Sequence, residues 1–155
     1  MREPCNPPAG DPDLDCSALP PALRLGEPVT DHLHAEFLLL LEQAAQAPDG
    51  ALLAALDEWL DHTRYHFGQE EAWMEAMGYG PRDCHRTEHE QMLAIAARAR
   101  GCVEQGDAET GRRLIAELPG WLAQHIGQRD APMVAHMREN GFTLVEGPVQ
   151  GQAAP

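Results

Sequence analysis

The chain has 155 residues, enough for one domain with a hydrophobic core, and 43% of them are hydrophobic. Its formal net charge of -14 argues against nucleic acid or an anionic membrane as a partner, because both require clustered positive charge. No apolar run approaches the length of a membrane span, so we expect no transmembrane helix.

The composition of the two ends predicts tails around a single domain. Residues 1–24 are rich in proline and are expected to form a tail or an extended arm, and residues 143–155 a flexible C-terminal tail. The domain is predicted to span residues 25–142. The first residues lack the basic start and apolar segment of a signal peptide, and the four cysteines have neither zinc-type nor disulfide-framework spacing. We therefore expect a reducing, cytoplasmic location.

Apolar periodicity predicts four helices between the tails. The first begins within residues 28–31 and ends near 47, and the second covers 51–77. The third covers 82–106, and the fourth covers 107–140. Strand-like alternation is almost absent, so the predicted class is all-α. Short connections between the helices favour an up-down-up-down four-helix bundle with an extended N-terminal arm.

Each predicted helix carries histidine or acidic residues on its apolar stripe. In chain order these residues are His34, His66, Glu70, His85, His89, His125 and Asp130. Residues four apart lie one turn apart on the same helix face, so both side chains can reach one point in the bundle interior. A lone buried histidine is usually satisfied by an ordinary hydrogen bond. Seven such groups on four facing stripes instead predict a metal site, because each unsatisfied buried group costs about 1–3 kcal/mol.

The donor types narrow the choice of metal. Imidazole with carboxylate and no thiolate fits iron, manganese or zinc and disfavours copper(I). Seven ligands exceed the four of a tetrahedral zinc site. They suit two six-coordinate ions bridged by both carboxylates, and iron is the expected occupant.

The order and spacing of these residues resemble the hemerythrin family. A lone His34 is followed by H-x-x-x-E at 66–70, H-x-x-x-H at 85–89 and H-x-x-x-x-D at 125–130. The surrounding segments GEPVTDHLH, HFGQEEAWMEAMGY and WLAQHIGQRD are similar to those of bacterial members. The resemblance covers about residues 25–140.

This resemblance implies a pair of iron ions that bind dioxygen reversibly. One iron would take His85, His89 and His125, and the other His34 and His66. Glu70 and Asp130 would bridge the two irons together with an oxo or hydroxo group, and dioxygen would bind at the iron with two histidines. The positions of the family's apolar oxygen pocket are matched by Phe67, Trp121, Leu122 and Ile126.

Two other classes of function stay open at this point. The same centre could belong to an enzyme, either a diiron peroxidase or a nitric oxide scavenger, or to a sensor of oxygen or redox state. Only two of the expected ligands are carboxylates, and no further acid or base stands out, which favours reversible binding over catalysis. A sensor is disfavoured because no output domain is predicted.

Three local features carry further expectations. His125 and Asp130 are five residues apart, about 140° around an ideal helix, so the fourth helix should widen or bend before Pro132 to bring both inward. Pro119-Gly120 is expected to interrupt the same helix. The remaining histidines have no place in the pattern and are expected at the surface: His32, His62 and His136. A place near the site stays open for His32.

Overall fold

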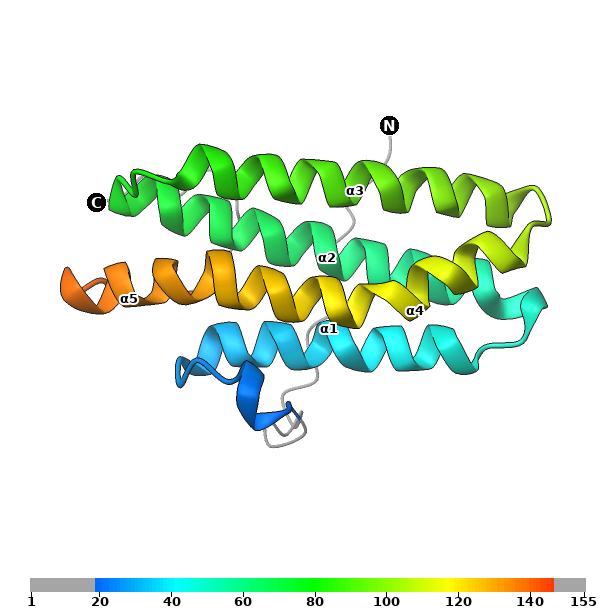
Figure 1. Cartoon of the computed structure of the whole chain (residues 1–155), viewed down its shortest axis with the longest axis horizontal. Coiled ribbons are helices and arrows are strands. Elements are labelled where there is room, and N and C mark those ends of the chain that lie inside the picture. The colour runs from blue at the N-terminus through cyan, green and yellow to red at the C-terminus, as the bar shows by residue number, and fades with distance from the viewer. Residues whose placement is uncertain (1–18, 147–155) are drawn as a thin grey trace.

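Helices form the whole architecture of residues 19–146, the part of the chain that this computed structural model describes. A short 3-10 helix, η2 (Pro21–Leu23), is followed by α1 (Pro28–Gln46), α2 (Asp49–Met77), α3 (Arg82–Glu104), α4 (Ala108–His125), η3 (Ile126–Asp130) and α5 (Ala131–Glu139). The last three run on without a break and make the fourth long rod of the bundle (Figure 1). The prediction of an all-α four-helix bundle is confirmed. Most of both predicted tails lies outside the described residues.

The helix ends follow from local chemistry. The Glu27 carboxylate accepts hydrogen bonds from the backbone N–H groups of Val29 and Thr30, at 2.7 and 3.0 Å, and so caps α1. The second helix begins at Asp49, two residues earlier than expected, because an acid in the first turn is favourable there. It ends at Met77 and is capped by Gly78, whose φ of 62° is the left-handed conformation typical of a helix terminus.

The segment before α1 is fixed against the bundle. The Asp31 carboxylate accepts hydrogen bonds from the backbone N–H groups of Leu25 and Gly26, at 2.8 and 3.1 Å. Arg138 of α5 donates to the Leu25 carbonyl oxygen at 2.9 Å. These bonds join the start of α1 to α5, and Asp31 lies one turn before His34 on α1.

Two distortions were expected in the fourth rod, one at Pro119-Gly120 and one after His125. The structure has only the second. Pro119 and Gly120 do not interrupt α4, because both are exposed while the flanking Leu118 and Leu122 are buried and hold the helix by packing. The expected distortion after His125 is confirmed. Residues Ile126–Asp130 form a π-helical turn, closed by a hydrogen bond from the backbone N–H of Ala131 to the Ile126 carbonyl oxygen.

Two apolar clusters fill the bundle, one toward each end of the helices. The larger cluster contains Phe37, Leu41, Leu52, Leu56, Trp59, Met92, Ala96, Val103, Leu114, Ile115, Leu118 and Leu122, among others. The smaller cluster contains Leu33, Trp73, Met74, Tyr79, Met133, Val134, Met137 and Leu144. On α1, on α2 and along the fourth rod, the polar residues singled out above lie between members of these two clusters.

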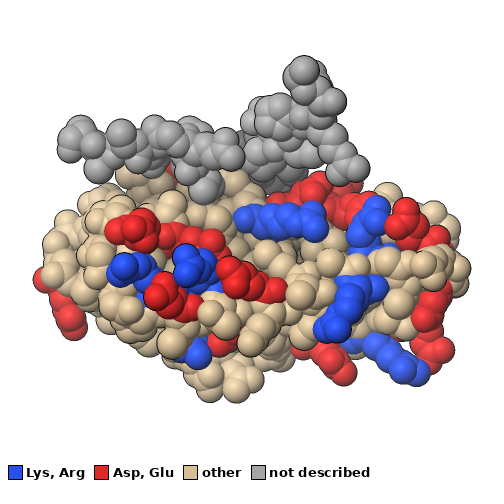
Figure 2. All heavy atoms as spheres, turned by 90° about the horizontal axis from the view of Figure 1, so that it is seen from above, with Lys and Arg blue, Asp and Glu red and all other residues tan. Residues whose placement is uncertain are grey.

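Charged side chains of both signs are intermixed on the surface. Figure 2 shows arginines lying among acidic side chains on one long face. Arg100, for example, lies 2.6 Å from Asp57, and Arg112 lies 2.6 Å from Asp49. Exposed pairs of this kind contribute at most about 1 kcal/mol each. Within residues 19–146, no helix is both long enough and apolar enough to cross a membrane.

Candidate metal centre

The seven residues predicted as ligands converge in the middle of the bundle, and we call them the ligand layer. They come from α1, α2, α3, α4 and η3, and each is at most 1% exposed: His34, His66, Glu70, His85, His89, His125 and Asp130. Ionisable side chains are almost never buried this deeply unless they are paired or bind a cation. Their role as ligands remains a prediction. The distances between their nitrogen and oxygen atoms show whether they could hold a metal ion.

Three histidines form one half of the layer, the three-histidine group. The Nε2 atom of His125 lies 3.2 Å from Nε2 of His85 and 3.1 Å from Nε2 of His89. Two atoms bound at right angles to one ion, with bonds of about 2.1 Å, are about 3 Å apart. The three nitrogens therefore have the spacing of neighbouring ligands on a single cation.

Two histidines form the other half, the two-histidine group. His34, His66 and Glu70 each offer a ligand atom, and these atoms lie within 4.8 Å of one another. Glu70 also belongs to the first group with His85, His89 and His125. The layer thus contains two clusters that could each hold an ion, and one carboxylate is common to both.

Each carboxylate directs one oxygen toward each group. Glu70 Oε1 lies 2.8 Å from Nε2 of His66, while Oε2 lies 3.1 Å from Nε2 of His89. Asp130 Oδ2 lies 2.9 Å from Nε2 of His34, while Oδ1 lies 3.0 Å from Nε2 of His85. This is the arrangement required of a carboxylate that bridges two cations.

Buried atoms without partners indicate that the layer suits cations. Among the described residues, Glu70 Oε2 and Asp130 Oδ1 have no hydrogen-bond partner, although imidazole nitrogens lie about 3 Å away. The nitrogens and oxygens are close but not aligned for hydrogen bonds, as expected for atoms aimed at a common point between them. An unsatisfied buried carboxylate oxygen is costly, so a cation at that point would stabilise the layer.

The pKa values of the ligand layer also indicate that positive charge is favourable there. Burial alone would lower the pKa of His85 and of His125, but the nearby Asp130 and Glu70 carboxylates raise these values to about 9 and about 11. Burial alone would raise the pKa of Glu70, but His66 and the other close imidazoles hold it well below its usual range. His66 differs, because burial is the dominant effect and lowers its pKa to about 4.

Comparison with known proteins decides the family. Residues 28–136 match the family model of the hemerythrin HHE cation binding domain. The chain belongs to the hemerythrin family. It is 42% identical over 120 residues to a bacteriohemerythrin of Ralstonia nicotianae, and the aligned region makes up 77% of this chain and 88% of the relative. It is 32% identical over 133 residues to a bacteriohemerythrin of Pseudomonas paraeruginosa, and this aligned region makes up 83% of this chain and 86% of the relative. No solved structure gives a significant match.

Outside its ligand layer, this hemerythrin-family protein places carboxylates behind two of the histidines. Glu71 Oε1 lies 3.0 Å from Nδ1 of His89, and Glu88 Oε1 lies 2.8 Å from Nδ1 of His125. Burial alone would raise the pKa of Glu88, but the hydrogen bonds from His125 and Arg129 lower it. The sequence reasoning missed these carboxylates, although each directly adjoins a predicted ligand in the chain.

A third carboxylate explains an incorrect prediction about His62. This histidine is buried rather than at the surface: its Nε2 donates to the Leu33 carbonyl oxygen at 3.1 Å, and its Nδ1 lies 3.2 Å from Glu36. Glu36 also lies 3.0 Å from Nε2 of His32. Burial alone would raise the pKa of Glu36, but His62 and His32 lower it. His32 and His136 are half-buried.

Two of the four predicted pocket residues stack on the ligand layer, and all four belong to the larger apolar cluster or pack against it. Phe67 stacks on His89 with ring centroids 3.9 Å apart, and Trp121 stacks on His125 at 4.7 Å. Leu122 and Ile126 are buried members of the larger cluster. Phe67 also approaches His66, at 5.5 Å, so it adjoins both histidine groups. Their role as an oxygen pocket remains a prediction.

Proposed function

We propose that this hemerythrin-family protein is a non-heme diiron protein that binds dioxygen reversibly, for its carriage, storage or delivery. The observation that carries the proposal is the pair of buried carboxylates, Glu70 and Asp130, with one oxygen directed to each histidine group. His85, His89 and His125 would hold one iron, and His34 and His66 the other. A bridging oxo or hydroxo group would complete the centre. Two ferrous ions would supply the electrons with which dioxygen is held and released.

The difference between the two groups supports a binding site for a small ligand. Three imidazoles and two carboxylate oxygens face one position, whereas two imidazoles and two carboxylate oxygens face the other. The position with fewer protein ligands has room for an external molecule. We therefore assign dioxygen binding to the position held by His34 and His66.

The surrounding residues favour reversible binding over turnover. Phe67, Leu122 and Ile126 are at most 2% exposed, and as an apolar wall they would keep water from one side of the ligand layer. A dry site slows displacement of bound oxygen and loss of electrons from the metal. The buried His62, whose ring centroid lies 5.7 Å from that of His66, is paired with Glu36, and Glu71 and Glu88 face the outer nitrogens of His89 and His125. A dedicated catalytic acid or base would instead be directed at the bound molecule.

The decisive experiment is an oxygen cycle on iron-loaded protein. The protein is reduced without air, exposed to dioxygen and then returned to an inert atmosphere while its visible absorption is followed. We expect the absorption of the oxygenated form to appear and disappear over several cycles, with two irons per chain by elemental analysis. A single irreversible bleaching, or steady turnover of hydrogen peroxide with a reducing substrate, would instead support the enzymatic alternative.

A further inference from the structure

The two histidine groups differ in what lies behind the rings. In the three-histidine group, His89 and His125 each have a carboxylate at Nδ1, at 3.0 and 2.8 Å, whereas Nδ1 of His85 is buried and has no hydrogen-bond partner among the described residues. In the two-histidine group, Nδ1 of His34 and Nδ1 of His66 are buried, and neither has a hydrogen-bond partner among residues 19–146. The outer nitrogen of an imidazole therefore has an anionic partner in one group only.

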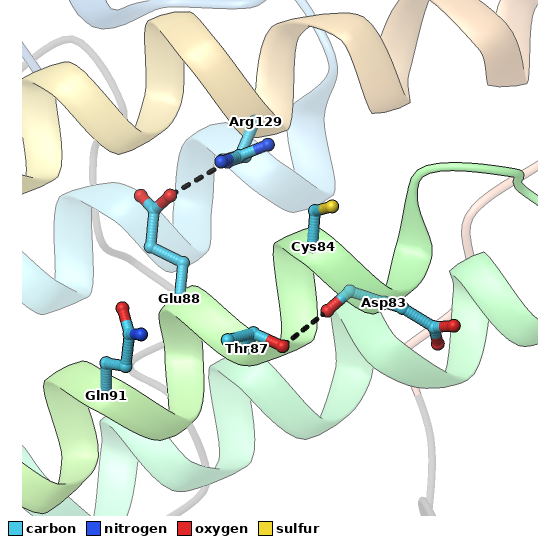
Figure 3. Close-up of a pocket in the computed structure, with 6 residues that line it drawn as sticks. All are labelled: Asp83, Cys84, Thr87, Glu88, Gln91 and Arg129. Atoms are coloured by element: carbon cyan, nitrogen blue, oxygen red, sulfur yellow. Dashed lines mark hydrogen bonds and ion pairs between the residues drawn. The ribbon is translucent and has the colours of Figure 1, made fainter.

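Glu88 is itself held in place by a third residue. Arg129 Nε donates to Glu88 Oε2 at 2.8 Å, while Glu88 Oε1 faces His125. Figure 3 shows Glu88 on α3 reaching across to Arg129, which belongs to the π-helical turn between His125 and Asp130. The same turn that brings Asp130 inward thus fixes the carboxylate behind His125. Glu88 lies in the wall of a surface hollow, and its side chain is 22% exposed.

A carboxylate behind a histidine strengthens the bond on the ring's other side. An N–H group that donates to an anion leaves more electron density on the opposite nitrogen, which becomes a better metal donor, and it also fixes the ring's orientation. Loss of such a partner typically weakens metal binding about 10–100-fold. His34 and His66 receive no such support from their Nδ1 atoms.

We propose that Glu88, fixed by Arg129, and Glu71 are positioning residues that make the three-histidine group the tighter of two metal positions, so that the first ion bound enters that group. The inference rests on the proposed dinuclear centre. The third histidine of that group also makes its metal binding tighter. The two glutamates contact no metal position themselves. Variants of them therefore separate the effect of the carboxylates from the effect of the third histidine.

The test is a titration of the metal-free protein with cobalt(II), followed by visible absorption in the presence of a competing chelator. The parent should bind two ions in two steps of different affinity. His34→Gln should abolish the weaker step and retain the tighter one, which assigns each step to a group. Far-UV circular dichroism and thermal unfolding without metal establish that each variant is folded.

Glu88→Gln is the central variant because it keeps the side chain's shape and one acceptor oxygen for His125, while it removes the charge and replaces the oxygen that accepts from Arg129 with an amide NH2. We expect the tighter step to weaken about 10–100-fold while the weaker step changes little. Glu71→Gln should weaken the same step less, because that side chain is 35% exposed and its contact is longer. Arg129→Gln should act in the same direction as Glu88→Gln, and more weakly. Glu90→Gln is the matched control, because this exposed residue of α3 has no contact with a ligand.

The possible failures are distinguishable. A parent that binds fewer than two cobalt ions contradicts the dinuclear centre itself. If the parent binds two ions but His34→Gln abolishes the tighter step, the order of binding is the reverse of the one proposed. If folded Glu88→Gln or Glu71→Gln retains the parent's affinity at the tighter step, the residue concerned has no positioning role. Glu71→Gln keeps the proposal testable should Glu88→Gln not fold.

Discussion

The ligand layer and the larger apolar cluster lie on the same four rods, and both are buried, but their side chains have opposite requirements. In the apolar cluster, Leu52 and Leu56 are fully buried and need only close packing. In the ligand layer, the equally buried Glu70 and Asp130 each leave an oxygen without a hydrogen bond among the described residues. The first region needs only packing, whereas we expect the second to need a cation.

This contrast predicts that removing the metal has the largest effect on stability. A ligand at about a thousand times its Kd adds about 4 kcal/mol per site, and 1 kcal/mol shifts the Tm by roughly 3 °C for a domain of this size. Two occupied sites should therefore raise the Tm by on the order of 20 °C. Thermal unfolding with and without a chelator measures the shift. Equal Tm values in the two conditions would mean that the ligand layer is satisfied without metal.

Replacing the shared carboxylate should break the link between the two metal positions. In Glu70→Gln the amide keeps the shape of the side chain, but a neutral group bridges two cations poorly. We expect the chain to retain about one iron instead of two. Elemental analysis after dialysis measures the content, and Glu75→Gln on the exposed face of α2 is the control. Two irons bound with the parent's affinity would show that Glu70 does not bridge.

The sequence predicted the convergence of these seven polar residues better than it predicted what surrounds them, and the physical reason is locality. The stripe positions of His66 and Glu70 follow from the helical period alone, and the spacing of His125 and Asp130 already required a wider turn. The carboxylate behind His125 belongs to Glu88, 37 residues away, so it depends on how α3 packs against the fourth rod. Sequence spacing carries no information about that packing.

The two incorrect predictions have the same origin. His62 was expected at the surface because it lies outside the ligand pattern, but Leu33 and Glu36 of α1 supply partners for both ring nitrogens. Pro119 was expected to interrupt its helix by its local preference, but packing of the adjacent leucines outweighs the loss of one backbone hydrogen bond. Tertiary contacts decided both positions.

Leu122→Ala tests the boundary between the two regions. Leu122 is fully buried one turn before His125, so truncation should cost about 2–5 kcal/mol by creating a cavity. If it also walls the oxygen site, water should enter and autoxidation of the oxygenated form should accelerate. The measurement is decay of the visible absorption at matched iron content, well below the Tm of each protein.

Leu118→Ala is the matched control for this variant. Leu118 is 1% exposed, lies four residues earlier on the same helix and belongs to the same apolar cluster. It should lose similar stability and autoxidise at the parent's rate. Equal rates for Leu122→Ala and the parent, in folded proteins with two irons, would identify Leu122 as ordinary core.

Gly111→Ala should affect packing alone and have the smallest effect. A methyl group at this buried position of α4 would overlap Cγ2 of Val103 on α3 and lie 3.5 Å from Cδ2 of Leu52. Val103 is branched at Cβ and cannot easily rotate away, so overpacking should cost about 1–3 kcal/mol, partly offset by about 1 kcal/mol from alanine's higher helix propensity. Thermal unfolding should show a small decrease in Tm, with two irons still bound. The double variant Gly111→Ala with Val103→Ala makes room for the methyl group and should recover part of the loss. A loss of iron in Gly111→Ala would contradict the independence of the two regions, because this residue lies in the apolar cluster's contact between α3 and α4 and touches no ligand.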